Sequence, residues 1–177
     1  MIKQRLQSLK IAFTSWPSAI QWGKCAAIYA GFSLVAGGLG FSTGFLKIEL
    51  MTATPRMFAI IPVLIFIRPA LIEETVFRGA FVPHVREEQS RASVLVSAAL
   101  SLIVFVAMHP LNGIFFKTSA HDVYIHPVFL ASAALLGLAC TVAYRITGSL
   151  WPSIAMHWMT VTCWTVFFGG KRLLTGS

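Results

Sequence analysis

The sequence predicts an all-α, multi-pass transmembrane bundle of about five membrane helices, preceded by a short interfacial helix. Of the 177 residues, 56% are hydrophobic and only 11% are charged, whereas soluble domains usually carry about 25% charged residues. The apolar residues also form runs close to the ~20 residues that a helix needs to cross a bilayer. We therefore expect an integral membrane protein.

The N-terminal segment, residues 1–18, is basic and amphipathic. In a helix, Leu6, Leu9 and Phe13 would share one face, with Lys and Arg side chains on the other. Such a helix is suited to lie in the bilayer interface. The segment lacks a compact apolar core followed by small residues at a cleavage site, so we do not expect a signal peptide.

Apolar segments long enough to span the membrane follow, separated by stretches rich in Pro, Gly or charge. They cover about residues 19–46, 57–82, 92–109, 127–145 and 149–168. No repeat or low-complexity stretch interrupts them, and no second domain is evident. We expect one membrane domain over residues 1–177, with residues 57–168 as its motif-bearing core.

The net charge of +8 comes from 14 Lys and Arg against 6 Asp and Glu. The basic residues cluster at the ends of apolar segments, which indicates membrane anchoring and not nucleic-acid binding. An N-terminus on the cytoplasmic side would place seven basic residues inside and five outside. The positive-inside rule therefore favours a cytoplasmic N-terminus.

Two of the six carboxylates lie side by side in apolar surroundings, as Glu73 and Glu74 of the stretch LIEETVFRGA. A charged group at membrane depth costs about 2.5–3.5 kcal/mol on insertion scales. Arg78 follows Glu74 at the i,i+4 spacing at which opposite charges pair in a helix. Glu73 is rotated by about 100° from Glu74, so we predict Glu74 as half of a structural ion pair and Glu73 as the free carboxylate. The alternative is a buried salt network of both glutamates with Arg68 and Arg78.

Two histidines are the other ionisable groups of interest in these segments. His109 ends the third segment, and Pro110 predicts that the helix breaks there. His157 lies in the second turn of the last segment. If segments two and three turn near residues 89–90, Glu73 and His109 are level to within about 3 Å. We expect Glu73, His109 and His157 to converge inside the bundle, although a lone histidine at a helix end is also commonly a satisfied interface residue.

The remaining histidines and the cysteines are expected to have no chemical role. His84 lies near the charged end of the hairpin, and His121 and His126 lie in the loop KTSAHDVYIHP. We expect these three in contact with solvent or headgroups. The cysteines at 25, 140 and 163 match no metal or redox spacing, so we expect them to be small apolar packing residues.

Three motifs occur in an order that resembles a known family. They are Glu73-Glu74-x-x-x-Arg78-Gly79, Phe105-x-x-x-His109 and TGSLWPSIAMH ending at His157. Over about residues 57–165, their order and spacing are similar to those of the CPBP family of intramembrane proteases. This family includes type II CAAX prenyl endopeptidases, bacteriocin-processing proteins and Abi-type relatives. The resemblance implies peptide-bond hydrolysis inside a helical membrane bundle.

The resemblance also implies a role for each motif residue. Glu73 and His109 would activate a water molecule as the general-base pair. Glu74 and Arg78 would shape the site, in agreement with their i,i+4 spacing. His157 would help to stabilise the tetrahedral oxyanion.

The chain departs from the family pattern at one position. The family commonly has an asparagine four residues after the last motif histidine as a further oxyanion donor, and this chain has Val161 there. Valine cannot donate a hydrogen bond, and loss of one such donor can cost about 10²–10³ in rate. Asn112, shortly after His109, is a candidate substitute.

No cofactor is expected, and zinc is the alternative. Glu73, His109 and His157 would supply a carboxylate and two imidazoles, with one coordination position open. The chain has no His-Glu-x-x-His helix, and a Glu/His pair can activate water without metal. We therefore favour a metal-independent mechanism.

These observations predict an intramembrane endopeptidase that acts on a membrane-embedded or lipid-anchored peptide or protein. Val161 keeps open the alternative of an inactive or weak family member that serves as a membrane binding or immunity-type protein. A proton-coupled transporter that uses the glutamates as a relay is a third alternative. It is disfavoured because the chain shows no internal repeat symmetry.

Overall fold

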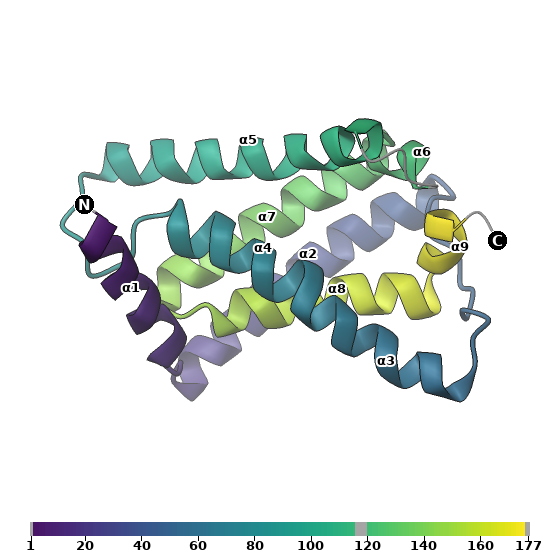
Figure 1. Ribbon diagram of the computed structural model, residues 1–177, viewed down its shortest axis with the longest axis horizontal. Coiled ribbons are helices and arrows are strands. Elements are labelled where there is room, and N and C mark those ends of the chain that lie inside the picture. Colours follow the sequence, from purple (N-terminus) through teal and green to yellow (C-terminus); the bar gives the residue numbers. More distant parts are fainter. Residues whose placement is uncertain (1, 116–119, 176–177) are drawn as a thin grey trace.

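The structure, a computed structural model, describes residues 2–115 and 120–175, which form a bundle of helices (Figure 1). Within these residues there is no β-strand, only an isolated bridge between Glu49 and Phe168. The predicted all-α membrane bundle is therefore confirmed. The elements are α1 (Ile2–Thr14), α2 (Ala19–Ser42), α3 (Pro55–Ile65), η1 (Phe66–Leu71), α4 (Ile72–Glu74), η2 (Thr75–Ala80), α5 (Arg91–Phe115), α6 (His121–Tyr124), α7 (Pro127–Thr147), α8 (Trp151–Phe167) and α9 (Gly170–Thr175).

Four helical segments of the described chain are long and apolar enough to cross a membrane. They are Ala19–Ser42, Pro55–Ala80, Arg91–Phe115 and Pro127–Thr147. The fifth predicted segment is helical as α8, which has 17 residues and so lies at the lower limit of about 17–25 residues for a spanning helix. Large apolar side chains such as Leu95, Leu100 and Ile103 are exposed along α5, as expected for a side that faces lipid.

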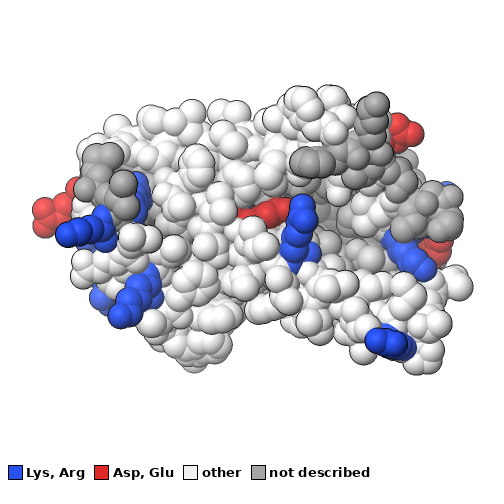
Figure 2. Space-filling model, viewed as in Figure 1, with Lys and Arg blue, Asp and Glu red and all other residues white. Residues whose placement is uncertain are grey.

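The charged side chains lie mainly at the two ends of the bundle. On the face drawn in Figure 2, Lys, Arg, Asp and Glu gather towards the two ends, and the middle is almost free of charge. One small acidic group beside a basic one interrupts this uncharged middle. Because charge is costly at membrane depth, this pattern fits an apolar belt between two polar ends.

Local sequence signals explain where several helices begin and end. Ser18 and Gln21 form a capping box at the start of α2. Thr54 caps α3 directly before Pro55, and His126 caps α7 directly before Pro127; proline suits the first helical position because no N–H is needed there.

The segment Pro55–Ala80 is not a straight α-helix. Arg68 has a non-helical backbone (φ −141°, ψ 115°), as expected for a residue that precedes a proline. The π-helical stretches η1 and η2 lie on either side of the single turn of α4. This segment packs against α8, where the indole Nε1 of Trp158 donates to the carbonyl of Pro62 at 2.8 Å. The glutamates therefore follow directly after a kink in the span.

The predicted helix break at His109 is wrong, because α5 continues through Pro110 to Phe115. Proline removes the backbone hydrogen bond to the carbonyl four residues earlier. In membrane helices, packing of neighbouring elements allows this loss, and α5 packs against both α6 and α7. Tertiary packing thus overrides the local preference, and His109 lies inside a helix, not at its end.

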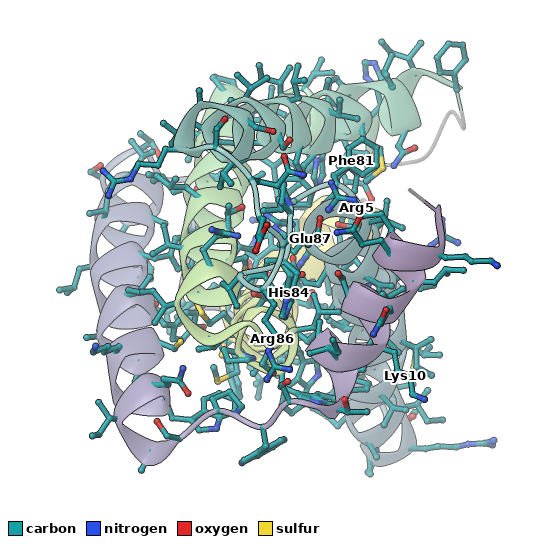
Figure 3. All side chains as sticks on the ribbon, turned by 90° about the vertical axis from the view of Figure 1, so that its left-hand side faces the viewer. Arg5, Lys10, Phe81, His84, Arg86 and Glu87 are labelled. Atoms are coloured by element: carbon teal, nitrogen blue, oxygen red, sulfur yellow. The ribbon has the colours of Figure 1, made fainter. Side chains whose placement is uncertain are left out.

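The N-terminal helix is present as α1 and is docked on one end of the bundle (Figures 1 and 3). Ala12 is fully buried there, in a cluster that Leu9 and Phe13 pack against. The backbone of Leu150 donates to the carbonyl of Ala12 at 3.1 Å. Leu6, which was expected on the same face as Leu9, is 62% exposed. The helix is therefore held by the protein on part of its apolar face, and its place in the bilayer interface stays a prediction.

His84 is buried, in contrast to the expected contact with solvent. It is 1% exposed, and its Nε2 lies 2.9 Å from the carbonyl of Gly148 in the turn between α7 and α8. Gly148 has φ +66°, which favours glycine, and a Cβ there would lie 3.1 Å from Nε2 of His84. Figure 3 shows His84 in the 81–87 turn, between α1 and the α7–α8 connection. His84 thus links the 81–87 turn to the turn between α7 and α8. Its charged sequence neighbours did not indicate this buried position.

Candidate active site

A cavity of about 710 Å³ lies within the bundle. Its wall is mostly apolar and is formed by residues of α2, α3, η1, α5, α7 and α8, among others. The polar side chains on it include Arg68, Glu73, His109, Asn112, Tyr124, His157 and Thr160. A mainly apolar pocket with a few convergent polar groups is typical of a small-molecule or substrate site.

Glu74 lies behind the cavity wall and is completely buried. Its Oε1 accepts from Nη1 of Arg78 at 3.0 Å and from Nδ1 of His157 at 2.8 Å. The predicted i,i+4 ion pair is therefore confirmed, although the segment beyond Glu74 is π-helical. Because a buried arginine stays charged, Glu74 is expected to be a carboxylate and to accept both bonds.

Arg78 is 1% exposed and has contacts on several sides. Its Nη2 donates to the carbonyl of Gly137 in α7 at 2.8 Å. Its guanidinium carbon lies 4.7 Å from the ring centroid of Phe105 in α5, within the range of a cation–π contact. Arg78 thus ties η2 to two neighbouring helices.

Glu73 faces the cavity. Its side chain is 19% exposed, and its Oε2 has no hydrogen-bond partner within the described part of the chain. Nε2 of His157 lies 3.8 Å from this Oε2. No ion pair joins Glu73 to Arg68 or Arg78 among the described residues, so the alternative salt network contains Glu74 but not Glu73.

His157 bridges the two glutamates from α8. Its Nδ1 is bound to Glu74, which leaves Nε2 directed towards Glu73. A carboxylate can only accept, so Nδ1 carries a proton. The sequence did not predict the contact with Glu74, because residues 74 and 157 lie in different segments.

His109 also lines the cavity. Its Nδ1 lies 2.9 Å from the carbonyl of Phe105, one turn earlier in α5. A carbonyl can only accept, so Nδ1 is the donor, and Nε2 of a neutral ring is left as an acceptor. The ring centroid lies 5.1 Å from Phe105 and 5.2 Å from Phe129, which fixes its orientation.

The cavity therefore collects most of the side chains that the motifs pointed to. Glu73, His109, Asn112 and His157 line it, whereas Glu74 and Arg78 support it from behind. Val161 also lines it, with a side chain that cannot donate. The chemical role of each residue stays a prediction.

Two lining residues were not predicted as site residues. Arg68 was considered only for a salt network, although a charged residue in mid-span next to a proline is a signal that can be read from sequence. Tyr124 lies on α6, outside the apolar segments, and carried no such signal.

The side chains that would form the alternative zinc site are Glu73, His109 and His157. Within residues 2–115 and 120–175, no three His, Cys, Asp or Glu side chains come together in a group that could hold a metal ion. The set Glu73, His109 and His157 does not fit such a site in this arrangement. Metal dependence stays a prediction.

Comparison with known proteins places the chain in a family. The family model described as type II CAAX prenyl endopeptidase Rce1-like matches residues 55–163, more than half of the chain. This range contains η1, α4 and η2 with both glutamates, and the segments that carry His109 and His157. No curated protein and no solved structure matches significantly. The chain belongs to the Rce1-like family of type II CAAX prenyl endopeptidases.

Proposed function

We propose that this protein is an intramembrane endopeptidase, which hydrolyses a peptide bond of a membrane-embedded or lipid-anchored peptide or protein. The single observation that carries the proposal is the position of Glu73. Its Oε2 is unbonded on the cavity wall, whereas Oε1 of the adjacent Glu74 accepts from both Arg78 and His157. A carboxylate held in this way is available to accept a proton from a water molecule.

The proposed reaction needs no group outside the chain other than water. Glu73 takes one proton from the water as its oxygen attacks the scissile carbonyl carbon, and Nε2 of His109 accepts a hydrogen bond from the same water. The carbonyl oxygen becomes an oxyanion, which a protonated His157 stabilises through Nε2. When the intermediate collapses, the C–N bond breaks and Glu73 returns its proton to the leaving amine. The products are a carboxylic acid and an amine.

Glu74 and Arg78 are positioning residues in this proposal. Glu74 holds Nδ1 of His157 at 2.8 Å, so that Nε2 is directed to the cavity. Arg78 in turn fixes Glu74.

The test uses purified protein in nanodiscs with two kinds of internally quenched peptide, one with a farnesylated cysteine and one with an apolar transmembrane segment. We expect Glu73→Gln and His109→Ala to abolish cleavage while the proteins stay folded. Glu88→Gln and His121→Ala are matched controls, because Glu88 is exposed and neither residue lines the cavity. Cleavage at the normal rate by Glu73→Gln would contradict the mechanism.

Val161 favours a second candidate function, a weak or inactive family member that binds a membrane peptide without cleaving it. This residue faces the cavity with an isopropyl group at the position of the expected oxyanion donor. Binding of both peptides by the native chain with no cleavage of either would support this candidate.

We also propose a cytoplasmic N-terminus, on the distribution of basic residues. Labelling of a Lys3→Cys variant with a membrane-impermeant thiol reagent in cells and in inverted vesicles tests this orientation. Labelling in intact cells would contradict it.

A further inference from the structure

Arg68 is a cation in the middle of a membrane span. It is the fourteenth of the 26 residues of Pro55–Ala80, and its non-helical backbone sets it apart from the helices on either side. The side chain is exposed and lines the same cavity as Glu73. Within the described part of the chain it makes no hydrogen bond or ion pair. Intramembrane charges are normally paired, so an anion from outside the chain is expected to meet it.

The two carboxylates of this span do not pair with Arg68. Glu73 is the one carboxylate among the described lining residues, and no ion pair joins it to Arg68. Glu74 is already paired with Arg78. The Arg68 guanidinium on the cavity wall is therefore complementary to an anionic ligand.

Tyr124 supplies a neutral donor on the wall of the same cavity. α6 packs tightly on α5, since a Cβ at Gly113 would lie 3.3 Å from Cβ of Tyr124. The Tyr124 ring lies 6.2 Å from that of His109 and 5.7 Å from that of Phe129. Burial raises the pKa of Tyr124, the negative charge of Glu73 raises it further, and Arg68 opposes the shift. The phenol thus stays protonated at neutral pH and can donate a hydrogen bond.

We propose that Arg68 and Tyr124 form an anion subsite that binds a carboxylate of the substrate peptide, either an acidic side chain or a free C-terminus. The proposal rests on the proposed function in taking the cavity as the place where the peptide binds. Arginine and a phenol can each donate to one carboxylate, and the guanidinium fork matches its geometry.

The depth of Arg68 favours a peptide over a lipid as the source of the anion. Arg68 lies thirteen positions after Pro55, which is roughly 20 Å at 1.5 Å per residue. The hydrocarbon core is about 30 Å thick, so Arg68 lies far from the level of the lipid phosphates. A peptide that enters the cavity to reach Glu73 brings its own carboxylate to this depth.

The experiment measures binding, so that it does not depend on cleavage. Glu73→Gln protein in phosphatidylcholine nanodiscs is titrated with pairs of fluorescent apolar peptides that differ only in a C-terminal carboxylate or amide, or in Glu or Gln. We expect the carboxylate form to bind at least about 10-fold more tightly. In Glu73→Gln/Arg68→Gln the preference should disappear, and Tyr124→Phe should reduce it by a few-fold.

A charge reversal and a matched control separate direct contact from a structural effect. Arg68→Glu should reverse the preference in favour of peptides that carry Lys in place of Glu, which a merely structural role would not produce. Arg56→Gln should leave the preference intact, because Arg56 is exposed in the same span and does not line the cavity. Equal binding of the members of each pair, or an unchanged preference in Arg68→Gln, would overturn the proposal.

Two further arms distinguish the other outcomes. If the carboxylate form of each peptide is not preferred but Arg68→Gln weakens binding of phosphatidylglycerol, a lipid phosphate occupies the subsite. The peptide proposal is then overturned. If the native chain cleaves both members of each pair equally well, the endopeptidase proposal stands and the subsite fails. If the carboxylate preference depends on Arg68 but nothing is cleaved, the subsite stands and the endopeptidase proposal fails.

Discussion

Glu73 and Glu74 are neighbours in the sequence but lie in two different regions of the molecule. Glu74 belongs to a buried polar core with Arg78 and His157, in which Oε1 of Glu74 accepts two bonds of 3.0 Å or less. Glu73 belongs to the cavity wall, where Oε2 is unbonded within the described chain. The rotation of about 100° between successive helical residues places one carboxylate in each region.

The comparison shows two ways in which a membrane protein can contain charge. In the polar core the charges are held by specific partners, as Arg78 is by Glu74 in the same span and by the carbonyl of Gly137 in α7. On the cavity wall, Oε2 of Glu73 and the Arg68 side chain make no hydrogen bond to the described residues and are thus available to a ligand. Changes in the first region should therefore affect stability, and changes in the second should affect chemistry and binding.

The largest effect on stability is expected for Arg78→Leu. This change leaves Glu74 as a buried carboxylate without its cationic partner. It also removes the hydrogen bond from Arg78 to the carbonyl of Gly137. Breaking a buried ion pair in this way costs about 3–5 kcal/mol. Unfolding in mixed micelles measures the free energy of unfolding. Arg56→Leu is the control, because Arg56 is exposed. A loss below about 1 kcal/mol would show that the core does not depend on this pair.

The next largest effect is expected on the cavity side, for Val161→Asn. Asparagine would place an amide donor on the wall one turn after His157. Because one oxyanion donor is worth about 10²–10³ in rate, we expect kcat to rise by up to that factor if the native chain is an enzyme limited by this position.

The control for this prediction is Val161→Ala, which enlarges the cavity without adding a donor. An equal gain in both variants would assign the effect to space and not to hydrogen bonding. No cleavage by the native chain or by either variant would favour the peptide-binding function.

Local features of the sequence predicted much of this architecture. The apolar runs predicted the spans, and the i,i+4 spacing predicted the pair of Glu74 and Arg78. Both signals depend only on residues that are close in the chain. The contact of His157 with Glu74 joins residues 83 positions apart. The path of α5 through Pro110 depends equally on neighbouring helices. Such contacts follow from packing, which a single sequence does not display.

The burial of His84 and the position of Tyr124 were harder to predict for the same reason. His84 is surrounded in sequence by charge, which favours a solvated position, yet α1 and the α7–α8 turn cover this end. Tyr124 reaches the cavity because Gly113 permits close packing of α6 on α5. Neither the burial of His84 nor the close approach of α6 to α5 produces a periodic pattern in the sequence.

A smaller effect on the polar core is expected for Gly137→Ala. The new Cβ would lie 2.6 Å from Cδ1 of Leu102 and 3.0 Å from Nη2 of Arg78. The leucine end can move, but the arginine is held by Glu74 and by the Gly137 carbonyl. Overpacking of this kind costs about 1–3 kcal/mol.

The free energy of unfolding again measures this effect, and Gly38→Ala is the matched control because a Cβ there meets nothing within 4 Å. We expect that control to be neutral or slightly stabilising, since alanine favours helix over glycine. Equal stability of both variants and the native protein would mean that Arg78 is free to move, and the polar core would then be less rigid than the contacts indicate.

The smallest effect is expected for Arg5→Gln, at the end of the bundle where α1 docks. Nη1 of Arg5 lies 3.2 Å from Oε1 of Glu87, and the arginine side chain is 36% exposed (Figure 3). Such pairs contribute about 0–1 kcal/mol, and Glu87 keeps its bond from the backbone N–H of His84. The free energy of unfolding should therefore change little, and the cleavage rate should not change. Lys10→Gln is the control, because it removes a neighbouring charge on α1. A loss as large as that of Arg78→Leu would show that docking of α1 depends on charge as strongly as the buried core does.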